Sequence, residues 1–447
     1  MGEPLVLCQV SAAVVVVLGC QAGLSRKPWG LPAAAIYVVL AFWYFGNVFQ
    51  SGFARLSIQF GEDRLNWAFL QILLFAVTFR IFVPLIYRLL APRGVVARYD
   101  PDRPLGPHEA RLLGSLSIVW AALTLLALWR LGGDIPSLLL PPLSQDPQYM
   151  WSRSAVGSGL EFLTSVAEYS HLAVGGLLGA VAVLAARPRT RRISLALFAA
   201  TLSPYLFQHA RHRALVVIAP GLIALAVVKN WSIRLRLCVC LSLAVTVSSW
   251  FVFMTDARTG KRAWGDFNSE SSVGENREPA GKTIVGLEMF DELCYIGELR
   301  DAGRYNPGFC GEYFQELVAF IPRTLWPGKP LIGVDYAIAR GFYDPRQANL
   351  VSVIIARGLV GQGVANCGNH LGPVVSAMLT AIWAGILGRL WAQRGDPARL
   401  GLCMIGLALT INMGRGISFL AIFPLVFSYI GVKCNETWSG RAAARCR

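Results

Sequence analysis

The chain has few charged residues for its length, because only 15% of its 447 residues are Asp, Glu, Lys or Arg. Soluble globular domains usually carry about 25%. Hydrophobic residues make up 55% of the chain, and the mean hydropathy is +0.50. So little charge cannot cover a soluble globule of this size with polar surface. The composition therefore excludes an ordinary soluble protein and predicts that lipid is the solvent for much of the surface.

Signals of several other protein classes are also missing. No Lys or Arg precedes the first apolar run, so we predict a retained first helix rather than a cleaved signal peptide. There is no internal repeat and no nucleic-acid-binding motif, although the net charge is +15. Cys238 and Cys240 form a Cys-x-Cys pair with no His or carboxylate beside it, so no metal site is predicted there. These absences leave the membrane as the expected partner of the basic charge.

Long, continuous apolar runs are abundant. A membrane-spanning helix needs about 20 mostly apolar residues, and continuous rather than alternating runs favour helices over a β-barrel. The predicted spans are 5–24, 31–50, 65–87, 112–131, 160–185, 193–208, 214–229, 235–254, 371–392, 399–414 and 417–433. The predicted fold is therefore an all-α polytopic membrane protein with about 11 transmembrane helices and one large extracytoplasmic loop containing short helices.

Lys and Arg are unevenly distributed between the connections. One alternating set of connections, together with the C-terminal tail, holds 21 of the 41 basic residues, whereas the short connections of the other set hold seven. Cytoplasmic loops are enriched in Lys and Arg, so the first set is predicted to be cytoplasmic and the N-terminus external. The predicted parts are a bundle of about eight helices (1–254), a large periplasmic loop (255–369), about three further helices (370–433) and a cytoplasmic tail (434–447).

The predicted periplasmic loop has the features of a folded unit. It is too long for a simple connection and nearly neutral, with 12 basic and 14 acidic residues. Two stretches, 312–321 and 335–342, have the pattern of short amphipathic helices. The loop also holds Cys294, Cys310 and Cys367 in a compartment that permits disulfides. Cys294 with Cys310 is a candidate pair, but the sequence does not settle the pairing.

Three arginines fall beside very short connections on the predicted outer side, which the charge bias normally depletes of basic residues. They are Arg211, Arg213 and Arg415. Charged residues at such depth usually face a polar cavity or a ligand, and guanidinium donors match phosphate oxygens. Interfacial snorkelling of the long side chains is the alternative. We favour anion binding, because snorkelling accounts more easily for one arginine than for three.

A proline-rich block in the outer loop carries two further cations. Residues 320–330 have the sequence Phe-Ile-Pro-Arg-Thr-Leu-Trp-Pro-Gly-Lys-Pro. Its prolines restrict the backbone and hold Arg323 in place, and Lys329 lies at the end of the block. Trp326 is expected either to stack on a sugar ring or to lie at the headgroup level, where the block would be an interfacial turn.

A glycine-rich stretch, 357–372, leads into the ninth predicted span. Glycine allows the backbone to approach a ligand or another helix closely. A glycine-rich re-entry into the membrane would explain the glycines. It does not explain why Arg357, Asn366 and His370 lie so close to the bilayer, and this favours a functional role for them.

These two motifs resemble those of a bacterial family. The outer loop is similar to that of the Wzy-type O-antigen polymerases, which polymerise oligosaccharide repeat units and carry a Phe-Ile-Pro-Arg-x-Leu-Trp-Pro-x-Lys-Pro block followed by a glycine-rich stretch. Residues 320–330 match the block closely, and 361–372 match the stretch loosely. Gln362 stands where the family often has Glu, so a role for that carboxylate is not carried over. The resemblance is best over about 290–375 and is mainly topological elsewhere.

The resemblance implies a glycosyltransferase acting on undecaprenyl-diphosphate-linked oligosaccharides at the outer face of the bacterial cytoplasmic membrane. The growing chain would leave its lipid diphosphate and join a hydroxyl of the next lipid-linked repeat unit. Fixed guanidinium groups would stabilise the charge on the leaving diphosphate, so no metal and no cofactor are expected. The residues expected to act in catalysis are Arg211, Arg323, Arg357 and Arg415, and those expected to bind substrate are Arg213, Trp326, Lys329, Asn366 and His370. The unranked candidates for a general base are Glu292, Glu298, Glu312, Asp335 and His370.

Other functions stay open at this point. An O-antigen ligase or another polyprenyl-phosphate-dependent glycosyltransferase would share the fold type and the donor. Glu62-Asp63 resembles the acidic pair that such enzymes use with a metal, although the adjacent Arg64 favours a solvated loop. A polysaccharide or lipid transporter is the non-enzyme alternative, but it would favour polar residues at the membrane midplane, where only Arg80 is predicted. The sequence also leaves open the sugar, the linkage, the oligomeric state and whether a chain-length regulator is a partner.

Overall fold

All regular structure among the described residues is helical. The computed structural model describes residues 3–91, 105, 109–139, 150–151, 161–207, 211–228, 288–306, 308–318, 333–342 and 355–418, with single positions between 232 and 249, between 321 and 330 and between 422 and 430. Six helices in this part are long and apolar enough to cross a membrane, namely Leu5–Leu24, Gly30–Ser51, Glu62–Leu90, Glu109–Arg130, Val166–Leu184 and Gly358–Ala392. The prediction of a helical membrane protein is confirmed, whereas the described part does not reach the predicted count of eleven spans.

Most predicted spans coincide with observed helices. The helices are α1 (Glu3–Leu24), α2 (Gly30–Leu40), the π-helix η1 (Ala41–Phe45), α3 (Gly46–Ser51), α4 (Phe53–Phe60), α5 (Glu62–Leu90), α6 (Glu109–Arg130), α7 (Ile135–Leu139), α8 (Glu161–Leu184), α9 (Pro188–Phe207), α10 (Arg211–Ile223), the π-helix η4 (Ala224–Val228), α12 (Met289–Asp301), α13 (Gly311–Leu317), α14 (Val334–Ala339), α15 (Gly358–Ala392) and α16 (Pro397–Met413). α9 covers the predicted span 193–208 but begins with an arginine-rich turn and is not among the six apolar spans. The predicted spans 235–254 and 417–433 lie largely outside the described residues.

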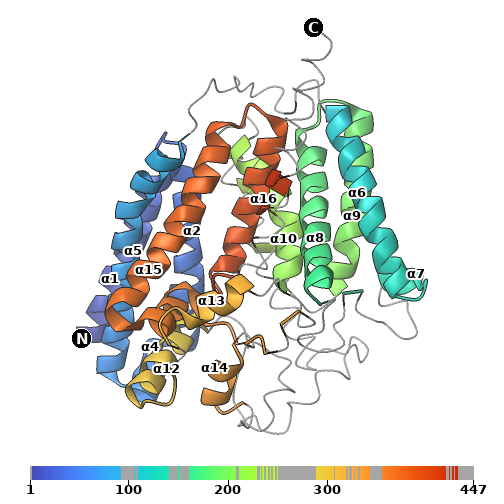
Figure 1. The fold of residues 1–447 in the computed structure, drawn as a ribbon. Helices are drawn as coiled ribbons and strands as arrows, with labels where there is room; N and C mark the ends of the chain where they lie inside the picture. The colour runs from blue at the N-terminus through green and yellow to red at the C-terminus, as the bar shows by residue number, and fades with distance from the viewer. Residues whose placement is uncertain are drawn as a thin grey trace.

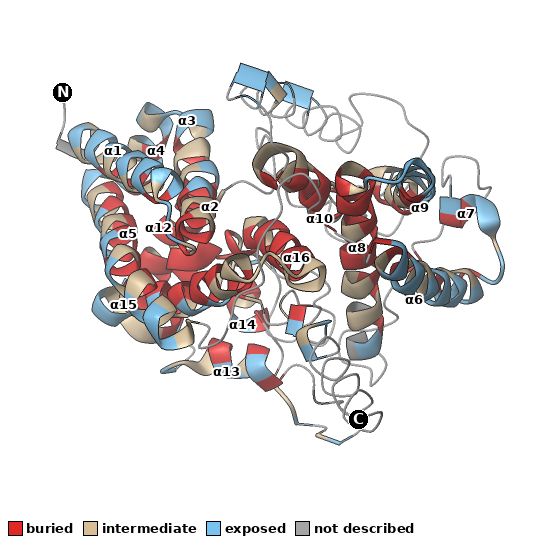
Figure 2. Cartoon of the chain, turned by 90° about the horizontal axis from the view of Figure 1, so that it is seen from above, coloured by how far each residue is buried: buried red, intermediate tan, exposed pale blue. Residues whose placement is uncertain are grey.

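Helices from the two ends of the sequence form one packed body (Figure 1). Seen from above, α1, α2, α5 and α15 lie on one side, α6, α8, α9 and α10 lie on the other, and α16 lies between them (Figure 2). Hydrogen bonds fix α16 in this place, since Trp43 Nε1 donates to the Ile411 carbonyl oxygen at 3.0 Å and Trp383 Nε1 donates to Thr410 Oγ1 at 2.9 Å. The C-terminal helices are therefore part of the centre of the bundle.

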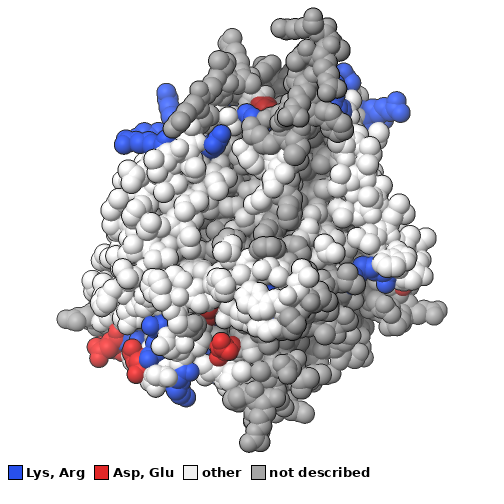
Figure 3. Space-filling model, viewed as in Figure 1, with Lys and Arg blue, Asp and Glu red and all other residues white. Residues whose placement is uncertain are grey.

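Apolar side chains cover the outer faces of the helices. On α6, Ile118, Leu125 and Trp129 are 73%, 65% and 77% exposed. Charged residues lie mostly toward the two ends of the molecule and leave a band of other residues between them (Figure 3). A helix that is apolar on its outward face as well as its inward face is typical of a membrane span, so this band fits a lipid environment.

The two ends of the bundle differ in structure. The connections α8–α9 (185–187) and α15–α16 (393–396) lie at one end, whereas the short helices α12, α13 and α14 lie at the other (Figure 1). The α8–α9 connection leads into Arg189, Arg191 and Arg192, which the charge bias assigns to the cytoplasm. In this orientation α12, α13 and α14 lie on the extracytoplasmic side.

Local sequence signals explain where individual helices begin. Asp396 caps α16 by accepting a hydrogen bond from Ala398 N at 3.0 Å, and a proline occupies the first turn. Glu62 and Asp63 form the first turn of α5, where negative charge is favourable at the positive end of the helix dipole. The adjacent Arg64 pairs with Asp301 at 2.5 Å. The acidic pair at the start of α5 therefore has a structural explanation.

Candidate functional site

The glycine-rich stretch at the start of α15 folds back on the rest of the helix. Gly368, with φ of 79° and ψ of −178°, interrupts α15. The two arms, 358–367 and 369–392, run side by side, because Ser376 Oγ donates to the Leu359 carbonyl oxygen at 2.7 Å. In a continuous helix these two residues, 17 positions apart, would be separated by about 25 Å. We call the whole of α15 the re-entrant hairpin.

Small residues allow the two arms to touch. A Cβ on Gly363 would lie 2.3 Å from the Gly372 carbonyl oxygen, and a Cβ on Gly372 would lie 2.5 Å from Val364 Cα. Gly368 supplies a positive φ that residues with a side chain rarely adopt. These glycines therefore allow the two arms to pack closely. Of the two roles expected from the sequence, approach to a ligand and approach to another helix, the structure shows the second.

Two other segments hold the start of the hairpin. Tyr44 Oη, on η1, accepts a hydrogen bond from Val360 N at 2.8 Å. Gly358 N donates to the carbonyl oxygen of Arg415, in the segment that follows α16, at 2.9 Å. The first N–H groups of a helix have no partner within it, so both contacts satisfy donors that would otherwise be buried and unpaired.

The amide of Gln362 forms a second link to the segment after α16. Its Oε1 accepts from Ile417 N at 2.6 Å, and its Nε2 donates to the Ile417 carbonyl oxygen at 3.2 Å. An ionised Glu could accept the first of these bonds but has no hydrogen to donate in the second. The structure thus gives a physical reason for Gln at a position where the Wzy-type pattern often has Glu.

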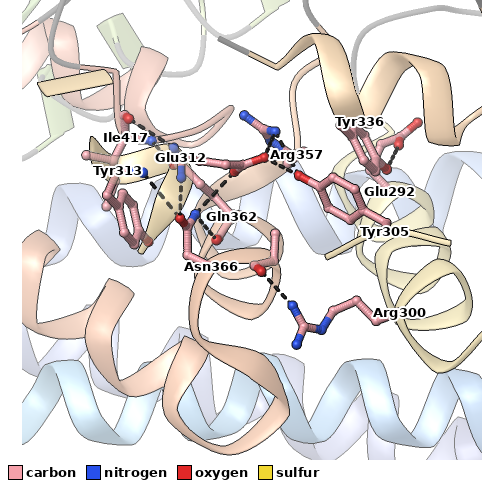
Figure 4. Close-up of polar contacts among 11 residues, drawn as sticks. Glu292, Arg300, Tyr305, Glu312, Tyr313, Tyr336, Arg357, Gln362, Asn366 and Ile417 are labelled. Atoms are coloured by element: carbon pink, nitrogen blue, oxygen red, sulfur yellow. Dashed lines mark hydrogen bonds and ion pairs between the residues drawn. The ribbon is translucent and has the colours of Figure 1, made fainter. Parts of the chain in front are cut away.

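A buried ion pair lies beside the first arm (Figure 4). Arg357 Nη1 donates to Glu312 Oε1, and both side chains are almost completely buried. Tyr305 donates to the same carboxylate oxygen, while Asn366 Nδ2 donates to the other at 3.1 Å. Asn366 Oδ1 in turn accepts from Glu312 N at 2.9 Å and Tyr313 N at 3.2 Å, which fixes α13 on the hairpin. A buried charge is tolerated when it is paired and hydrogen-bonded in this way.

A second ion pair lies next to the first. Arg340 donates twice to Glu292, at 3.1 and 3.2 Å, and Tyr336 donates to the same carboxylate. The rings of Tyr305 and Tyr336 are 5.2 Å apart and join the two pairs. Burial raises the pKa of both tyrosines above the ordinary value, so both phenols stay protonated and donate. We call the connected group the hairpin cluster, which consists of Glu292, Tyr305, Glu312, Tyr336, Arg340, Arg357 and Asn366.

Asp291 lies beside the hairpin cluster without an ion pair of its own among the described residues. It is buried at the start of α12, where Asn47 Oδ1 caps the helix by accepting from Phe290 N at 2.9 Å and Asp291 N at 3.1 Å. Burial raises the pKa of the Asp291 carboxyl to about 6, against the opposing effects of the Asn47 amide and the Arg55 guanidinium. A carboxyl group with such a pKa can accept and release a proton near neutral pH.

The other candidate bases differ in their surroundings. Glu292 and Glu312 each form an ion pair with an arginine, and Asp335 is exposed at the start of α14. Glu298 is half-buried, and burial raises its pKa. Asp291, which no sequence motif singles out, is thus buried without the arginine partner that Glu292 and Glu312 each have.

The structure brings some of the predicted site residues together. Arg357 and Asn366 belong to the hairpin cluster, and the Arg415 backbone contacts the residue that follows Arg357. The side chains of Arg211 and Arg323 lie outside the described part of the chain, so their positions stay predictions.

The remaining predicted residues occupy the surroundings of the hairpin. Trp326 lies with its ring centroid 6.5 Å from that of Phe314 on α13. Lys329 Nζ donates to the Ile321 carbonyl oxygen at 2.8 Å, within the proline-rich block. His370 is exposed, two residues after the turn of the hairpin.

Arg213 belongs to a separate polar group in the other half of the bundle. It pairs with Glu168 on α8, one turn from His171. His171 Nδ1 shares a hydrogen bond of 2.9 Å with Tyr205 Oη on α9, and Trp151 Nε1 donates to the same oxygen at 2.9 Å. We call these five residues the α8 cluster. Ionisable groups inside a span are costly and are usually functional.

Four residues of the site are not among those predicted from the sequence: Asp291, Tyr305, Tyr336 and Arg340. A signal for one of them was present, because Asp291 and Glu292 interrupt an otherwise apolar run at the start of α12. No comparable signal marked the tyrosines, since their role depends on contacts with residues distant in the sequence.

Among the described residues, no group of three or more His, Cys, Asp or Glu side chains is arranged to hold a metal ion. The site therefore offers guanidinium groups, phenols and carboxylates as its chemical groups. A search of protein-family models, of curated proteins and of solved structures finds no match to this chain.

Proposed function

We propose that this chain is a membrane-embedded glycosyltransferase that polymerises undecaprenyl-diphosphate-linked oligosaccharide repeat units at the outer face of the bacterial cytoplasmic membrane. The observation that carries the proposal is the hairpin cluster, a group of buried arginines, carboxylates and phenols held by a re-entrant hairpin at the end of an apolar bundle. The resemblance of the 320–330 block to the Wzy-type polymerases supports it from the sequence. Both lie on the side that the charge bias assigns to the exterior.

The proposed reaction forms one glycosidic bond and breaks one bond to phosphate. A hydroxyl of the incoming repeat unit attacks the anomeric carbon of the growing chain, and the lipid diphosphate leaves with the electron pair of the broken bond. A base takes the hydroxyl proton. We assign this role to Asp291, because it is buried, has a pKa of about 6 and has no ion-pair partner among the described residues. Guanidinium groups stabilise the departing diphosphate.

The arginines have different roles in this proposal. Glu312 neutralises Arg357, so a diphosphate would have to displace this carboxylate before it could pair with Arg357. We therefore propose that Arg357 positions the hairpin and Glu312. The diphosphate is assigned to Arg211, Arg323 and Arg415, with Trp326 and Lys329 of the block beside the sugar.

Deletion of the gene tests the proposed activity directly. We expect surface glycan made of single repeat units and no ladder of longer chains on a gel. Full-length polymer that is not transferred to its acceptor would indicate the ligase alternative instead. An unchanged glycan profile would refute both enzymatic functions.

Single substitutions test the assigned residues. Arg323→Ala and Arg211→Ala are each expected to abolish the ladder while the protein stays in the membrane, because each removes a donor to the leaving group. Arg192→Ala, at the opposite end of the bundle, is the matched control and should leave the ladder intact. Normal ladders from both of the first two variants would refute their role.

The α8 cluster is the observation that favours a transporter as the second candidate. Its Glu168, His171 and Arg213 lie within or at the edge of a bundle of membrane helices. Such residues can form an ion or proton pathway. A transporter would leave lipid-linked repeat units on the cytoplasmic face after gene deletion, whereas loss of the polymerase would leave them on the outer face. Labelling of the glycan in sealed vesicles of known orientation distinguishes the two outcomes.

A further inference from the structure

Two cysteines meet at the turn of the re-entrant hairpin. Cys310 Sγ, at the start of α13, lies 3.6 Å from Cys367 Sγ, in the residue that precedes Gly368. Both side chains are free thiols in this structure. A disulfide bond of about 2.05 Å would require the sulfurs to move about 1.5 Å closer. The two cysteines are 57 positions apart in the sequence, so the fold creates their contact.

The backbone around the cysteines is already fixed on both sides. Cys310 N donates to the Asn366 carbonyl oxygen at 3.0 Å, and the Asn366 side chain accepts from the next turn of α13. Cys310 has a φ of 57° and is the only residue other than glycine in the described part of the chain with a positive φ. The backbone segments that carry the two sulfurs are therefore held next to each other by contacts other than the one between the sulfurs.

No other described cysteine has a comparable position. Cys294, which the sequence offered as a partner for Cys310, is completely buried on α12. Cys403 is completely buried within α16. Cys310 and Cys367 are only half-buried, so a reagent or an oxidising protein can reach them.

We propose that Cys310 and Cys367 form a disulfide on the extracytoplasmic side, and that this bond staples α13 to the turn of the re-entrant hairpin. The oxidant is the disulfide of a thiol–disulfide oxidoreductase in that compartment. One cysteine thiolate attacks the oxidoreductase disulfide and forms a mixed disulfide, and the second thiolate then displaces the oxidoreductase sulfur. The two cysteines lose two electrons and two protons, and the oxidoreductase gains them as two thiols. This inference does not depend on the proposed glycosyltransferase activity.

The disulfide would act on the hairpin cluster through the contacts next to it. Glu312 lies two residues after Cys310, and Asn366 lies one residue before Cys367. These two side chains are hydrogen-bonded to each other at 3.1 Å. A covalent link here would therefore help to hold Glu312 at its place beside Arg357.

Mass spectrometry of the full-length protein tests the proposal. Membranes are isolated without reductant, free thiols are blocked with N-ethylmaleimide, and the protein is digested with trypsin. We expect the peptides 305–323 and 358–389 to be recovered as one disulfide-linked pair, which dithiothreitol separates. Recovery of both peptides carrying the maleimide, or a link from Cys310 to Cys294, would overturn the proposal.

Cysteine variants provide the matched controls. Cys310→Ser and Cys367→Ser should each lose the linked pair, whereas Cys294→Ser should keep it. In detergent, dithiothreitol should lower the thermal unfolding midpoint of the wild type and leave that of the Cys310→Ser/Cys367→Ser variant unchanged. An equal response of the two proteins to dithiothreitol would contradict a stabilising link.

Discussion

The hairpin cluster and the α8 cluster bury similar charges in different ways. In the hairpin cluster both members of the Arg357–Glu312 pair are almost fully buried, with side chains 5% and 3% exposed. In the α8 cluster Glu168 is buried to the same degree, but Arg213 keeps 21% of its side chain exposed. The comparison shows that one buried carboxylate can be stabilised either by a second buried charge or by a cation that keeps partial access to solvent.

The two clusters also differ in how far apart in the sequence their contributing elements lie. The α8 cluster is formed chiefly by consecutive helices that pack against one another, α8, α9 and α10. The hairpin cluster combines α12, α13, α14 and the start of α15, and η1 and the segment after α16 hold that start in place. Substitutions that unfold α12, α13 or α14 should therefore disturb the hairpin cluster and leave the α8 cluster intact.

The largest effect is expected from removing one carboxylate of each pair. Glu312→Gln removes the ion-pair partner of the deeply buried Arg357, and we expect it to lower the free energy of unfolding by about 3–5 kcal/mol. Glu168→Gln should cost less, because the partly exposed Arg213 can be solvated. Thermal unfolding of both variants in detergent gives the comparison. Equal losses would show that exposure of the arginine does not determine the cost.

The next largest effect is the dependence of stability on pH that Asp291, beside the hairpin cluster, should cause. Its carboxyl has a pKa of about 6 in the folded protein against 3.8 for the unperturbed group. The folded state therefore binds the proton more tightly, and stability falls as the pH rises from about 4 to about 6. Asp291→Asn should remove this dependence and stabilise the protein by up to about 3 kcal/mol above pH 6.

The activity of the same variant separates catalysis from folding. If Asp291 is the base, Asp291→Asn should lose about 100-fold or more of its polymerising activity in isolated membranes while its unfolding midpoint rises. A variant that gains stability and keeps full activity would remove Asp291 from the mechanism. The corresponding measurement on Glu298→Gln tests the alternative base.

A smaller effect is expected from adding one methyl group between the arms of the hairpin. Gly363→Ala would place a Cβ 2.3 Å from a backbone oxygen, and overpacking of this kind costs about 1–3 kcal/mol. In the other half of the bundle, Gly176→Ala would meet the ring of Pro220 at 2.7 Å. Gly114→Ala, which has open space around it, is the control and should not destabilise the protein. Thermal unfolding of the three variants ranks the contacts.

Another effect is expected at the link between the hairpin and the end of α16. Gln362→Glu keeps the bond from Ile417 N but loses the donor to its carbonyl oxygen. Leaving that oxygen unpaired should cost about 1–3 kcal/mol, and burial of the new carboxylate adds to this loss at neutral pH. Both losses should shrink at low pH, where Glu is protonated and can donate. Unfolding midpoints measured at pH 4 and pH 8 check this. A pH-independent loss would show that the bond to the carbonyl oxygen contributes little.

The helical membrane class was predictable because long apolar runs are local signals. The spans 65–87 and 112–131 match α5 and α6 to within a few residues, and the expected short helices at 312–321 and 335–342 correspond to α13 and α14. The span 371–392 matches the second arm of the hairpin, 369–392, to within two residues. Glycine, Asn and Gln lower the hydropathy of the first arm, so no apolar run predicts the helix that begins at Gly358.

The site was less predictable than the fold, because its contacts join distant residues. Arg357 was selected for its position near the membrane, but its partner Glu312 lies 45 positions earlier and was only one of several candidate bases. Cys310 was paired with Cys294 as a candidate, whereas the structure brings it to Cys367. Nothing local in either case identifies the partner, since the packing of α13 against the first arm of the hairpin creates these contacts.

The bonds from the hairpin to Arg415 and Ile417 have a consequence for the assembly of the protein at the ribosome. Gly358 and Gln362 depend on backbone groups that are synthesised more than 50 residues later. The hairpin is therefore synthesised before the last of its partners exists. The start of the hairpin, beside Arg357, acquires its final surroundings only after α16 and the segment that follows it have been synthesised.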